Sequence, residues 1–311
     1  MCIRDRVKGV KTNTYNNIVD KSTIFLHFLE LHGYVIGVQY TMDRREPDRA
    51  EQLQQRFAAV RSIGWEFRTR LLRVLIDAVY ADGDDAPLAL CLLLMMLCGL
   101  RTAEALGTHF SDFKMPYLYV SKQAHGRKVN GALKSAQAYR WVPVVSVLRD
   151  VIEHRRAHLK KYVRKASERS DLPLVSSSKS IYEPEREAVV VEYSKRIFRE
   201  IGFSDQILTH YTHLMSEISL AEIRKEDTSV YAYILRRDYI TRLYSTSLAP
   251  QMIDYLSAHQ QQDKQQYRPT RDELEPALHA LEQHGSEMGL DVYKRQPAVS
   301  ACAASDACQV A

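Results

Sequence analysis

Hydrophobic residues follow a helical spacing along the first part of the chain. From Gly64 to Val79 the apolar positions fall three or four residues apart, which predicts an amphipathic helix. The acidic turn Asp82–Asp85 ends this pattern, and Pro87 suits the first turn of the next helix. Residues 86–100 are almost entirely apolar, which predicts a helix buried in the core. This run is shorter than the roughly 20 residues that a membrane span needs.

The hydrophobic period changes after Asp112. Residues 117–120 and 140–145 are rich in aromatic and β-branched side chains, which favour strands. The segment between them is rich in Gly, Asn and Lys, which is typical of a basic hairpin. We therefore expect a small antiparallel sheet with a basic hairpin, inserted after the buried helix.

Helical spacing returns in the rest of the chain. It predicts further helices at residues 13–33, 146–163, 192–202, 230–246, 250–258 and 271–283. Residues 42–56 are highly polar and contain Pro47, which favours a linker or a solvated helix, and residues 176–180 form a polar loop. The predicted fold class is mainly α with a small antiparallel β-sheet (α+β).

A hexapeptide at the start of the chain and another near its end can be encoded by the same DNA string. Residues 1–6 read MCIRDR and residues 291–296 read DVYKRQ. One oligonucleotide, GATGTGTATAAGAGACAG, encodes DVYKRQ in one frame and begins MCIRDR when its first base is dropped. This string looks like a transposon end used in sequencing libraries. We expect residues 1–6 to be an artefact and residues 291–311 to be an artefact or a chimeric tail.

Composition narrows the class of protein. The 311 residues are 45% hydrophobic and 26% charged, which excludes a wholly disordered chain. Three of the five cysteines lie in the suspect end segments, and the remaining Cys91 and Cys98 lie in the apolar helix, where they act as small core residues. No disulfide framework, zinc spacing or P-loop is present, so we expect no metal and no cofactor.

Four segments that can carry chemistry stand in a distinctive order. They are Gly99 to Glu104 (GLRTAE), Leu133 to Pro143 (LKSAQAYRWVP), Tyr233 to Arg236 (YILR), and Leu256 to His259 (LSAH) followed by Tyr267. This order resembles the catalytic domain of tyrosine recombinases, the phage-type integrases. Their pattern is GLR-x-x-E, a hairpin lysine before an R-x-V-P strand, H-x-L-R, L-G-H and a tyrosine. The resemblance covers about residues 64–283.

The resemblance implies a role for each matching residue. Two guanidiniums, Arg101 and Arg236, clamp the phosphate, because charge develops on its oxygens during displacement. Lys134 is the general acid that protonates the leaving 5′ oxygen, and Tyr267 is the nucleophile. His259 donates a hydrogen bond to the phosphate. Lys122, Arg127 and Lys128 compete with Lys134 for its role, and Tyr244 and Tyr255 are rivals of Tyr267.

Two positions depart from the family pattern. The first histidine of H-x-L-R is Tyr233, and the glycine of L-G-H is Ala258. Tyrosine donates a hydrogen bond but is a poor base near neutral pH. Telomere resolvases, which share this catalytic domain, can carry tyrosine there. A telomere resolvase and a catalytically inactive DNA-binding relative therefore remain alternatives to an active recombinase.

The resemblance also implies a biological setting. We expect a site-specific DNA recombinase of a phage or mobile element, active in DNA integration by breaking and rejoining strands through a 3′-phosphotyrosine. Its partners are double-stranded DNA and three further copies in a homo-tetramer, with no membrane association, in the cytoplasm of a bacterium. Residues 60–287 form the catalytic domain, and residues 7–59 are part of a helical, DNA-clamping core-binding region. Residues 271–283 fit a helix docked on a neighbour or a plain capping helix.

The formal charge of +5 is modest for a DNA-binding protein, so positive charge has to be local. Residues 154–165 (HRRAHLKKYVRK) form one basic run, which is either a phosphate-binding face or a solvated helix face. The hairpin region supplies the other. The expected DNA-contacting residues are Lys122, Arg127, Lys128, Arg140 and Arg237.

Overall fold

The computed structural model describes residues 12–32, 63–131, 133, 135, 138–163, 172–202, 230–258 and 269–287. The chain divides into two compact units, which we call unit 1 (residues 1–60 and 216–230) and unit 2 (residues 61–215 and 231–311). The suspect segments 1–6 and 291–311, and the polar segment 42–56, lie outside the described residues.

The described part of unit 1 is one helix, α2 (Thr12–Leu31), which confirms the helix predicted at residues 13–33. Its apolar residues are not uniformly covered. Val19 is buried, whereas Ile18, Ile24 and Phe25 are exposed. The helical spacing therefore predicted the backbone correctly, although most of the large apolar side chains face outward.

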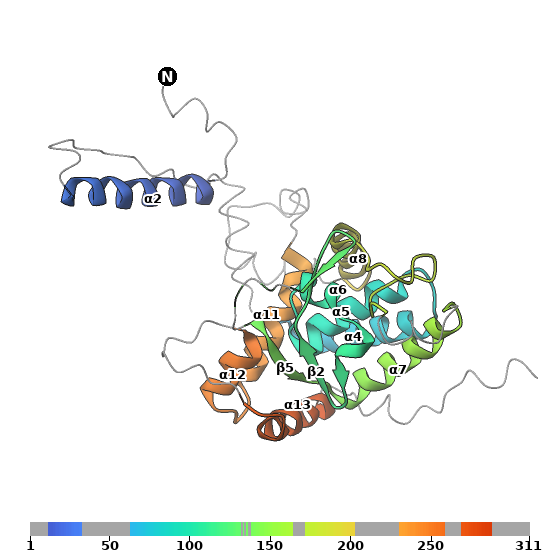
Figure 1. Cartoon of the computed structure of the whole chain (residues 1–311). Coiled ribbons are helices and arrows are strands. Elements are labelled where there is room, and N and C mark those ends of the chain that lie inside the picture. The colour runs from blue at the N-terminus through green and yellow to red at the C-terminus, as the bar shows by residue number, and fades with distance from the viewer. Residues whose placement is uncertain are drawn as a thin grey trace, which may run out of the picture. The chain divides into compact units, whose positions relative to one another are not determined.

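The core of unit 2 is built around α5 (Ala86–Cys98), in which every residue is buried. The amphipathic helix α4 (Trp65–Tyr80) packs its apolar side against α5, and Pro87 stands in the first turn of α5 as predicted. Helices α7 (Ser146–Lys160) and α8 (Glu187–Glu200) also contact α5, which lies in the middle of the helices in Figure 1. A helix covered on several sides must be apolar all round, as this one is.

The short helix α6 (Thr102–Gly107) and a 3-10 turn, η1 (Phe110–Asp112), lead from α5 into the strands. Strands β1 (Phe113–Lys114), β2 (Tyr117–Val120) and β5 (Arg140–Pro143) form an antiparallel sheet in the order β1-β2-β5. Strands β3 (Gln123–His125) and β4 (Lys128–Asn130) pair with each other in a separate hairpin. The predicted strands are confirmed, but the hairpin forms a second sheet instead of extending the first.

Helices α11 (Val230–Tyr244) and α12 (Pro250–Ser257) form where predicted. Helix α8 begins at Glu187, five residues before the predicted start. Its buried residues Val190, Tyr193 and Ile197 are spaced for a helix, and Val190 lies before the predicted start.

The C-terminal helix α13 (Glu275–Glu287) begins later than predicted and follows a 3-10 turn, η4 (Asp272–Leu274). Pro276 lacks an N–H group and suits the first turn of an α-helix, which explains this start. Glu282 accepts hydrogen bonds from the Ser146 backbone N (2.6 Å) and Oγ (2.9 Å) at the start of α7. In this structure α13 therefore packs on its own chain and caps the start of α7.

The prediction of a mainly helical fold with small antiparallel sheets is confirmed. Figure 1 shows the strands β2 and β5 between the helices α4 to α6 and the C-terminal helices α11 to α13. Among the helices that the structure describes, none has both the length and the apolar character to cross a membrane.

A candidate active site around Glu104

The site starts at the sharp corner between α5 and α6. Gly99 ends α5 in the left-handed conformation (φ 64°), which glycine adopts without a steric penalty. Arg101 then stands at the N-cap of α6, and Glu104 follows three residues later. The Arg101 backbone N donates to Glu104 Oε2 at 3.0 Å. The spacing in GLRTAE thus folds the carboxylate of Glu104 back over the start of its own helix.

Glu104 is the centre of the site. It is buried, and its carboxylate also accepts hydrogen bonds from Arg101 Nη1 (2.5 Å) and Arg140 Nη2 (2.9 Å). Burial alone raises the pKa of a carboxyl group, but Arg140 and Arg101 outweigh this effect and lower the pKa of Glu104 to about 2. Glu104 is therefore ionised at neutral pH, and it holds the surrounding guanidiniums by charge.

Arg140, on β5, is one of those guanidiniums. It is buried, and its other donors are used as well: Nη1 binds Ala138 O (2.9 Å) and Nε binds Leu256 O (3.1 Å). We expected this residue to contact DNA directly. In this structure Arg140 is buried with all three of its nitrogens bound by protein atoms, so a direct contact with DNA stays a prediction that requires these bonds to open. Arg140 links the sheet, α6 and the end of α12.

Arg236 reaches the same carboxylate from α11. Its Nη1 lies 3.9 Å from Glu104 Oε2 and donates to Gly99 O, while its Nη2 donates to Ser257 O. The side chain is buried, and its Nε has no hydrogen-bond partner among the described residues. Burial and the neighbouring charge of Arg140 lower the pKa of Arg236 to about 10, which leaves it protonated at neutral pH.

The two predicted clamp residues therefore converge on one place in the fold. Gly99 and Arg236 are 137 positions apart in the sequence, yet they are hydrogen-bonded. The Arg101 side chain is 42% exposed, whereas the Arg236 side chain is 1% exposed. Arg101 thus faces solvent at the mouth of this cluster, and Arg236 forms its floor. We call Arg101, Glu104, Arg140 and Arg236 the arginine cluster.

The end of α12 completes the described part of the site. Ser257 O accepts from Arg236, and Ala258 follows in the left-handed conformation (φ 50°) that ends the helix. A glycine adopts this conformation more readily, which gives a physical reason for the glycine in the L-G-H pattern. His259 comes next in the sequence. His259, Tyr267 and Lys134 all lie outside the described residues.

Two further predicted residues lie on α11. Tyr233 is exposed, and the Arg237 guanidinium lies over its ring at 5.0 Å from the centroid. Arg237 is partly exposed and stays a candidate DNA contact. Tyr233 stands one helical turn before Arg236, so its hydroxyl group is carried on the same segment as the predicted clamp.

The rival tyrosines differ in their surroundings. The hydroxyl of Tyr255 accepts a hydrogen bond from Trp141 N at 2.7 Å, and the residue is buried. This contact joins α12 to β5, so Tyr255 has a structural role. Tyr244, at the end of α11, is exposed.

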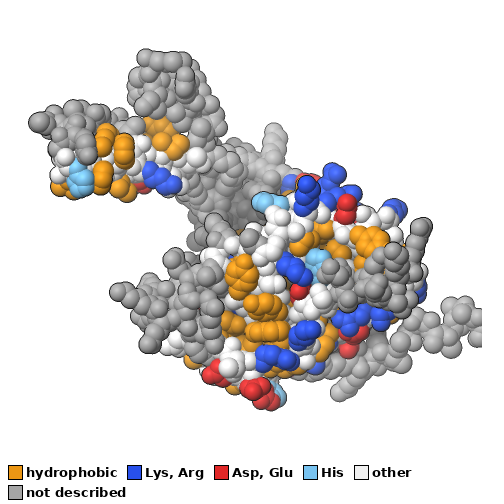
Figure 2. All heavy atoms as spheres, in the orientation of Figure 1, with side chains coloured by type: hydrophobic (Ala, Val, Ile, Leu, Met, Phe, Trp, Pro, Cys, Tyr) orange, Lys and Arg blue, Asp and Glu red, His pale blue; other side chains and the backbone are white. Residues whose placement is uncertain are grey.

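The basic hairpin lies at the surface. Lys122 pairs with Asp112 (2.9 Å) and Arg127 pairs with Glu183 (3.2 Å), while Lys128 is exposed. Figure 2 shows Lys and Arg side chains at several places on the visible face of unit 2, with acidic side chains among them. In the other basic run, residues 154–165, Arg155 and His158 are buried, so that segment is not a simple solvated face.

The residues that sequence reasoning missed are the ones that orient the cluster. Glu104 was recognised as part of GLR-x-x-E but was given no role, although its spacing three residues from Arg101 predicts their contact. Tyr239 packs against Gly99 so closely that no Cβ fits there. No local signal in the sequence points to that contact.

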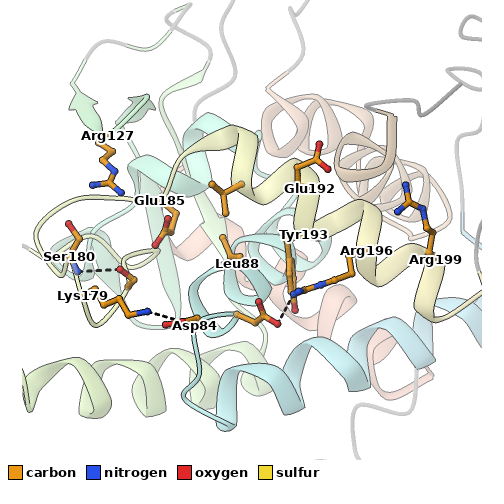
Figure 3. A pocket seen from close by; sticks show the side chains of 13 residues that line it. Asp84, Leu88, Arg127, Lys179, Ser180, Glu185, Glu192, Tyr193, Arg196 and Arg199 are labelled. Atoms are coloured by element: carbon orange, nitrogen blue, oxygen red, sulfur yellow. Dashed lines mark hydrogen bonds and ion pairs between the residues drawn. The ribbon is translucent and has the colours of Figure 1, made fainter. Parts of the chain in front are cut away.

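A separate cavity of about 890 Å³ lies between α8, the turn before α5 and the loop at residues 177–185. Lys179 pairs with Asp84 (2.9 Å), as Figure 3 shows, and Arg196 pairs with Asp85 (2.6 Å). Its balanced charges favour neither anions nor cations, and the arginine cluster does not line it. Within the described ranges, no group of three or more His, Cys, Asp or Glu side chains could hold a metal ion.

Comparison with known proteins gives similarity to solved structures alone, since no family model and no curated protein matches the chain. One similar structure is the Tn1549 transposon integrase in complex with transposon right end DNA, at 14% identity and a TM-score of 0.48, covering 93% of this chain and 82% of that chain. A variant of the same integrase with circular intermediate DNA matches at 13% identity and a TM-score of 0.48, covering 90% and 82%. Similarity of this degree assigns no residue and no activity to this chain.

Proposed function

We propose that this chain is a tyrosine-type DNA strand transferase, a site-specific recombinase or integrase that breaks and rejoins DNA through a 3′-phosphotyrosine. The observation that carries the proposal is the convergence of Arg101 and Arg236 on Glu104. Arg236 also binds Ser257 O at the end of α12, and His259 and Tyr267 follow α12 in the sequence. The two arginines come from separate motifs, GLRTAE and YILR, and they meet at one carboxylate in the fold. We further propose that the chain acts on double-stranded DNA as a homo-tetramer within a phage or bacterial mobile element.

The arginine cluster supplies what phosphoryl transfer needs most. Negative charge on the nonbridging oxygens grows when a nucleophile adds to the phosphorus, and forked N–H donors stabilise that charge. Arg101 is positioned to meet a phosphate from the exposed side. Arg236 has to exchange its bonds to Gly99 O and Ser257 O for phosphate oxygens, and its unpartnered Nε is the donor available first.

The reaction we propose balances without a cofactor. The Tyr267 oxygen attacks the phosphorus and forms the phosphotyrosine bond, its proton passes to solvent water, and the bond to the 5′ oxygen breaks. Lys134 donates a proton to that leaving oxygen, while His259 and Tyr233 donate hydrogen bonds to the phosphate. Attack by a 5′ hydroxyl of a second strand reverses each step and releases Tyr267. The bond energy is retained in the phosphotyrosine, so no nucleotide is needed.

Capture of the covalent intermediate tests the proposal. A pool of nicked duplexes with randomised sequence is incubated with the protein, and SDS-resistant protein–DNA adducts are isolated and sequenced. We expect adducts on a defined sequence with the parent protein and with Tyr244→Phe, an exposed tyrosine on α11. We expect none with Tyr267→Phe. An adduct that persists in Tyr267→Phe moves the nucleophile elsewhere, and failure of the parent to form any adduct rejects the enzyme.

One observation favours a second candidate, a DNA-binding relative that does not cut. Both Nη groups of Arg236 are engaged by backbone carbonyls, and the family histidine is replaced by Tyr233. For this alternative we expect sequence-specific binding to DNA but no adduct. A telomere resolvase, which the same Tyr233 favours, is distinguished by hairpin-ended products.

A further inference from the structure

A second group of buried charges surrounds Asp238, which lies on α11 two residues after Arg236. The carboxylate of Asp238 is fully buried and accepts four hydrogen bonds. Oδ1 accepts from Ile63 N (2.8 Å) and Arg68 Nη2 (2.8 Å), and Oδ2 accepts from Arg68 Nε (2.9 Å) and Arg242 Nε (3.0 Å). The bond with Arg68 is a two-pronged contact that fixes direction as well as distance. We call Arg68, Asp238 and Arg242 the Asp238 clamp.

The Asp238 clamp joins three elements. Arg68 belongs to α4 and also donates to Ile63 O at 2.7 Å. Arg242 belongs to α11, as Asp238 does, and its Nη2 donates to Met96 O (2.6 Å) in the last turn of α5. The backbone of α11 is therefore tied to α4 through a carboxylate and to α5 through a guanidinium.

Two arginines of α11 donate hydrogen bonds to backbone carbonyls at the end of α5. Arg242 binds Met96 O, and Arg236 binds Gly99 O three residues later. Between these bonds, the ring of Tyr239 packs against Gly99 with no room for a Cβ. Any rotation of α11 about its axis that breaks the Asp238 clamp also withdraws Arg236 from Gly99 O and from the neighbourhood of Glu104. The two groups of charges are thus coupled by one rigid helix.

From this geometry we propose that Asp238, with Arg68 and Arg242, is a positioning residue that sets the rotation of α11 and thereby aims Arg236 at the reacting phosphate. This inference rests on the function proposed above for Arg236. Buried ion clusters often contribute little net stability compared with apolar packing, and in some proteins their role is to specify how elements are oriented. Asp238 does not reach the arginine cluster itself, so its influence passes through the helix.

The test compares Asp238→Asn with Asp82→Asn. Asp82 also lies against buried or half-buried side chains, the imidazoles of His154 (3.2 Å) and His158 (2.8 Å), but it stands on the α4–α5 turn outside the cluster. The rate of adduct formation at saturating DNA, the DNA affinity and the unfolding midpoint are measured for each variant. We expect Asp238→Asn to lower the rate by about 10- to 100-fold, as for a small misplacement of a catalytic group, with DNA affinity within about twofold of the parent.

The expected rate for Asp82→Asn is that of the parent, measured at a temperature where every variant is folded. If Asp238→Asn has the same rate as Asp82→Asn there, the positioning role is overturned. Should Asp238→Asn fail to fold, Arg242→Met decides the question. It keeps the bond between Asp238 and Arg68 but removes the bond to Met96 O, and we expect a smaller loss of rate. A parental rate in Arg242→Met overturns the proposal.

If the parent protein forms no adduct, the proposed function is rejected. The coupling of Asp238 to Arg236 is then tested by a separate measurement of stability. The unfolding free energies of Asp238→Asn, Arg236→Lys and the double variant form a thermodynamic cycle. Coupled effects support a shared orientation of α11, because residues that act independently give additive changes. Additive effects overturn the inference whether or not the chain cuts DNA.

Discussion

At the scale of single residues, charge pairing inside the fold decides what each arginine can do. Arg101, Arg140 and Arg236 all surround Glu104, but only Arg101 is substantially exposed. Arg140 has every donor group occupied by protein atoms, and Arg236 lies beneath the surface. Three residues of one chemical type thus differ in their exposure and in which of their donor groups are bound by protein atoms.

The first prediction concerns the acid stability that Glu104 provides. Its pKa in the folded chain is about 2, below the ordinary 4.5, so its contribution is complete above about pH 4.5 and is lost as pH falls toward 2. The shift corresponds to about 3 kcal/mol at neutral pH. We expect Glu104→Gln to lower the free energy of unfolding at pH 7 and to flatten its fall between pH 4.5 and 2, measured by urea unfolding. Parallel pH curves for parent and variant contradict this.

The second prediction separates Arg101 from Arg140. Because Arg101 is partly exposed, Arg101→Ala should lower the free energy of unfolding by no more than about 1 kcal/mol while abolishing adduct formation. Arg140→Ala leaves the buried Glu104 without its closest interior partner, and we expect a loss of about 3 kcal/mol or more. Chemical unfolding and adduct yield are measured on both. Equal stability losses in the two variants contradict the assignment of roles.

At the scale of elements, the site depends on where helices end. Helix α5 ends at Gly99, α6 begins at Arg101, and α12 ends at Ala258. Carbonyls at helix C-termini lack partners within the helix, and cations there also meet the negative end of the helix dipole. Arg236 and Arg242 use this property twice on α5, at Gly99 O and Met96 O. The helix ends are therefore the attachment points of the charged groups.

The third prediction tests the corner between α5 and α6. A Cβ at Gly99 clashes with Tyr239 Cδ1, in addition to the strain of a left-handed backbone. We expect Gly99→Ala to destabilise the fold by about 2–4 kcal/mol. Gly126, at the hairpin turn, has a similar φ (62°) but open space around a Cβ, so Gly126→Ala should cost only about 1 kcal/mol. Thermal unfolding compares the two, and equal shifts contradict the packing argument.

At the scale of the whole molecule, the distribution of charge matters more than its sum. A formal charge of +5 over 311 residues is small, and part of the basic run at residues 154–165 is buried. On the hairpin, Lys128 is exposed, and the neighbouring Arg127 is paired with Glu183 at the surface. We therefore expect DNA affinity to depend on where a basic residue lies as well as on the net charge.

The fourth prediction compares two identical charge changes. Lys128→Glu on the hairpin should weaken DNA binding and reduce the slope of log affinity against log salt by roughly 1, the loss of about one phosphate contact. Lys160→Glu, at the exposed end of α7, alters the net charge equally and should have a smaller effect. Binding is measured by fluorescence anisotropy at several salt concentrations. Equal losses of affinity indicate that net charge alone governs binding.

The sequence predicted some parts of the site and missed others for identifiable reasons. The contact of Arg101 with Glu104 follows from their spacing, and the segments carrying Arg236 and Ser257 were placed on helices correctly. The burial of Arg140 was missed because a charged side chain was expected to face solvent, although Arg140 shares a face of β5 with the buried Val142. The Asp238 clamp was missed because Arg68 is 170 residues away from Asp238.

The sequence by itself determined the local structure. The apolar run predicts the buried helix α5, the change in hydrophobic period after Asp112 predicts the strands, and Pro87 and Gly99 mark the start and the end of α5. These features depend on backbone preferences and on the spacing of neighbours, which act within a few residues. Only the tertiary structure decided which arginines surround Glu104, which of them is exposed, and how α11 is held. Burial and ion pairing arise where distant segments pack together, and no local spacing encodes that packing.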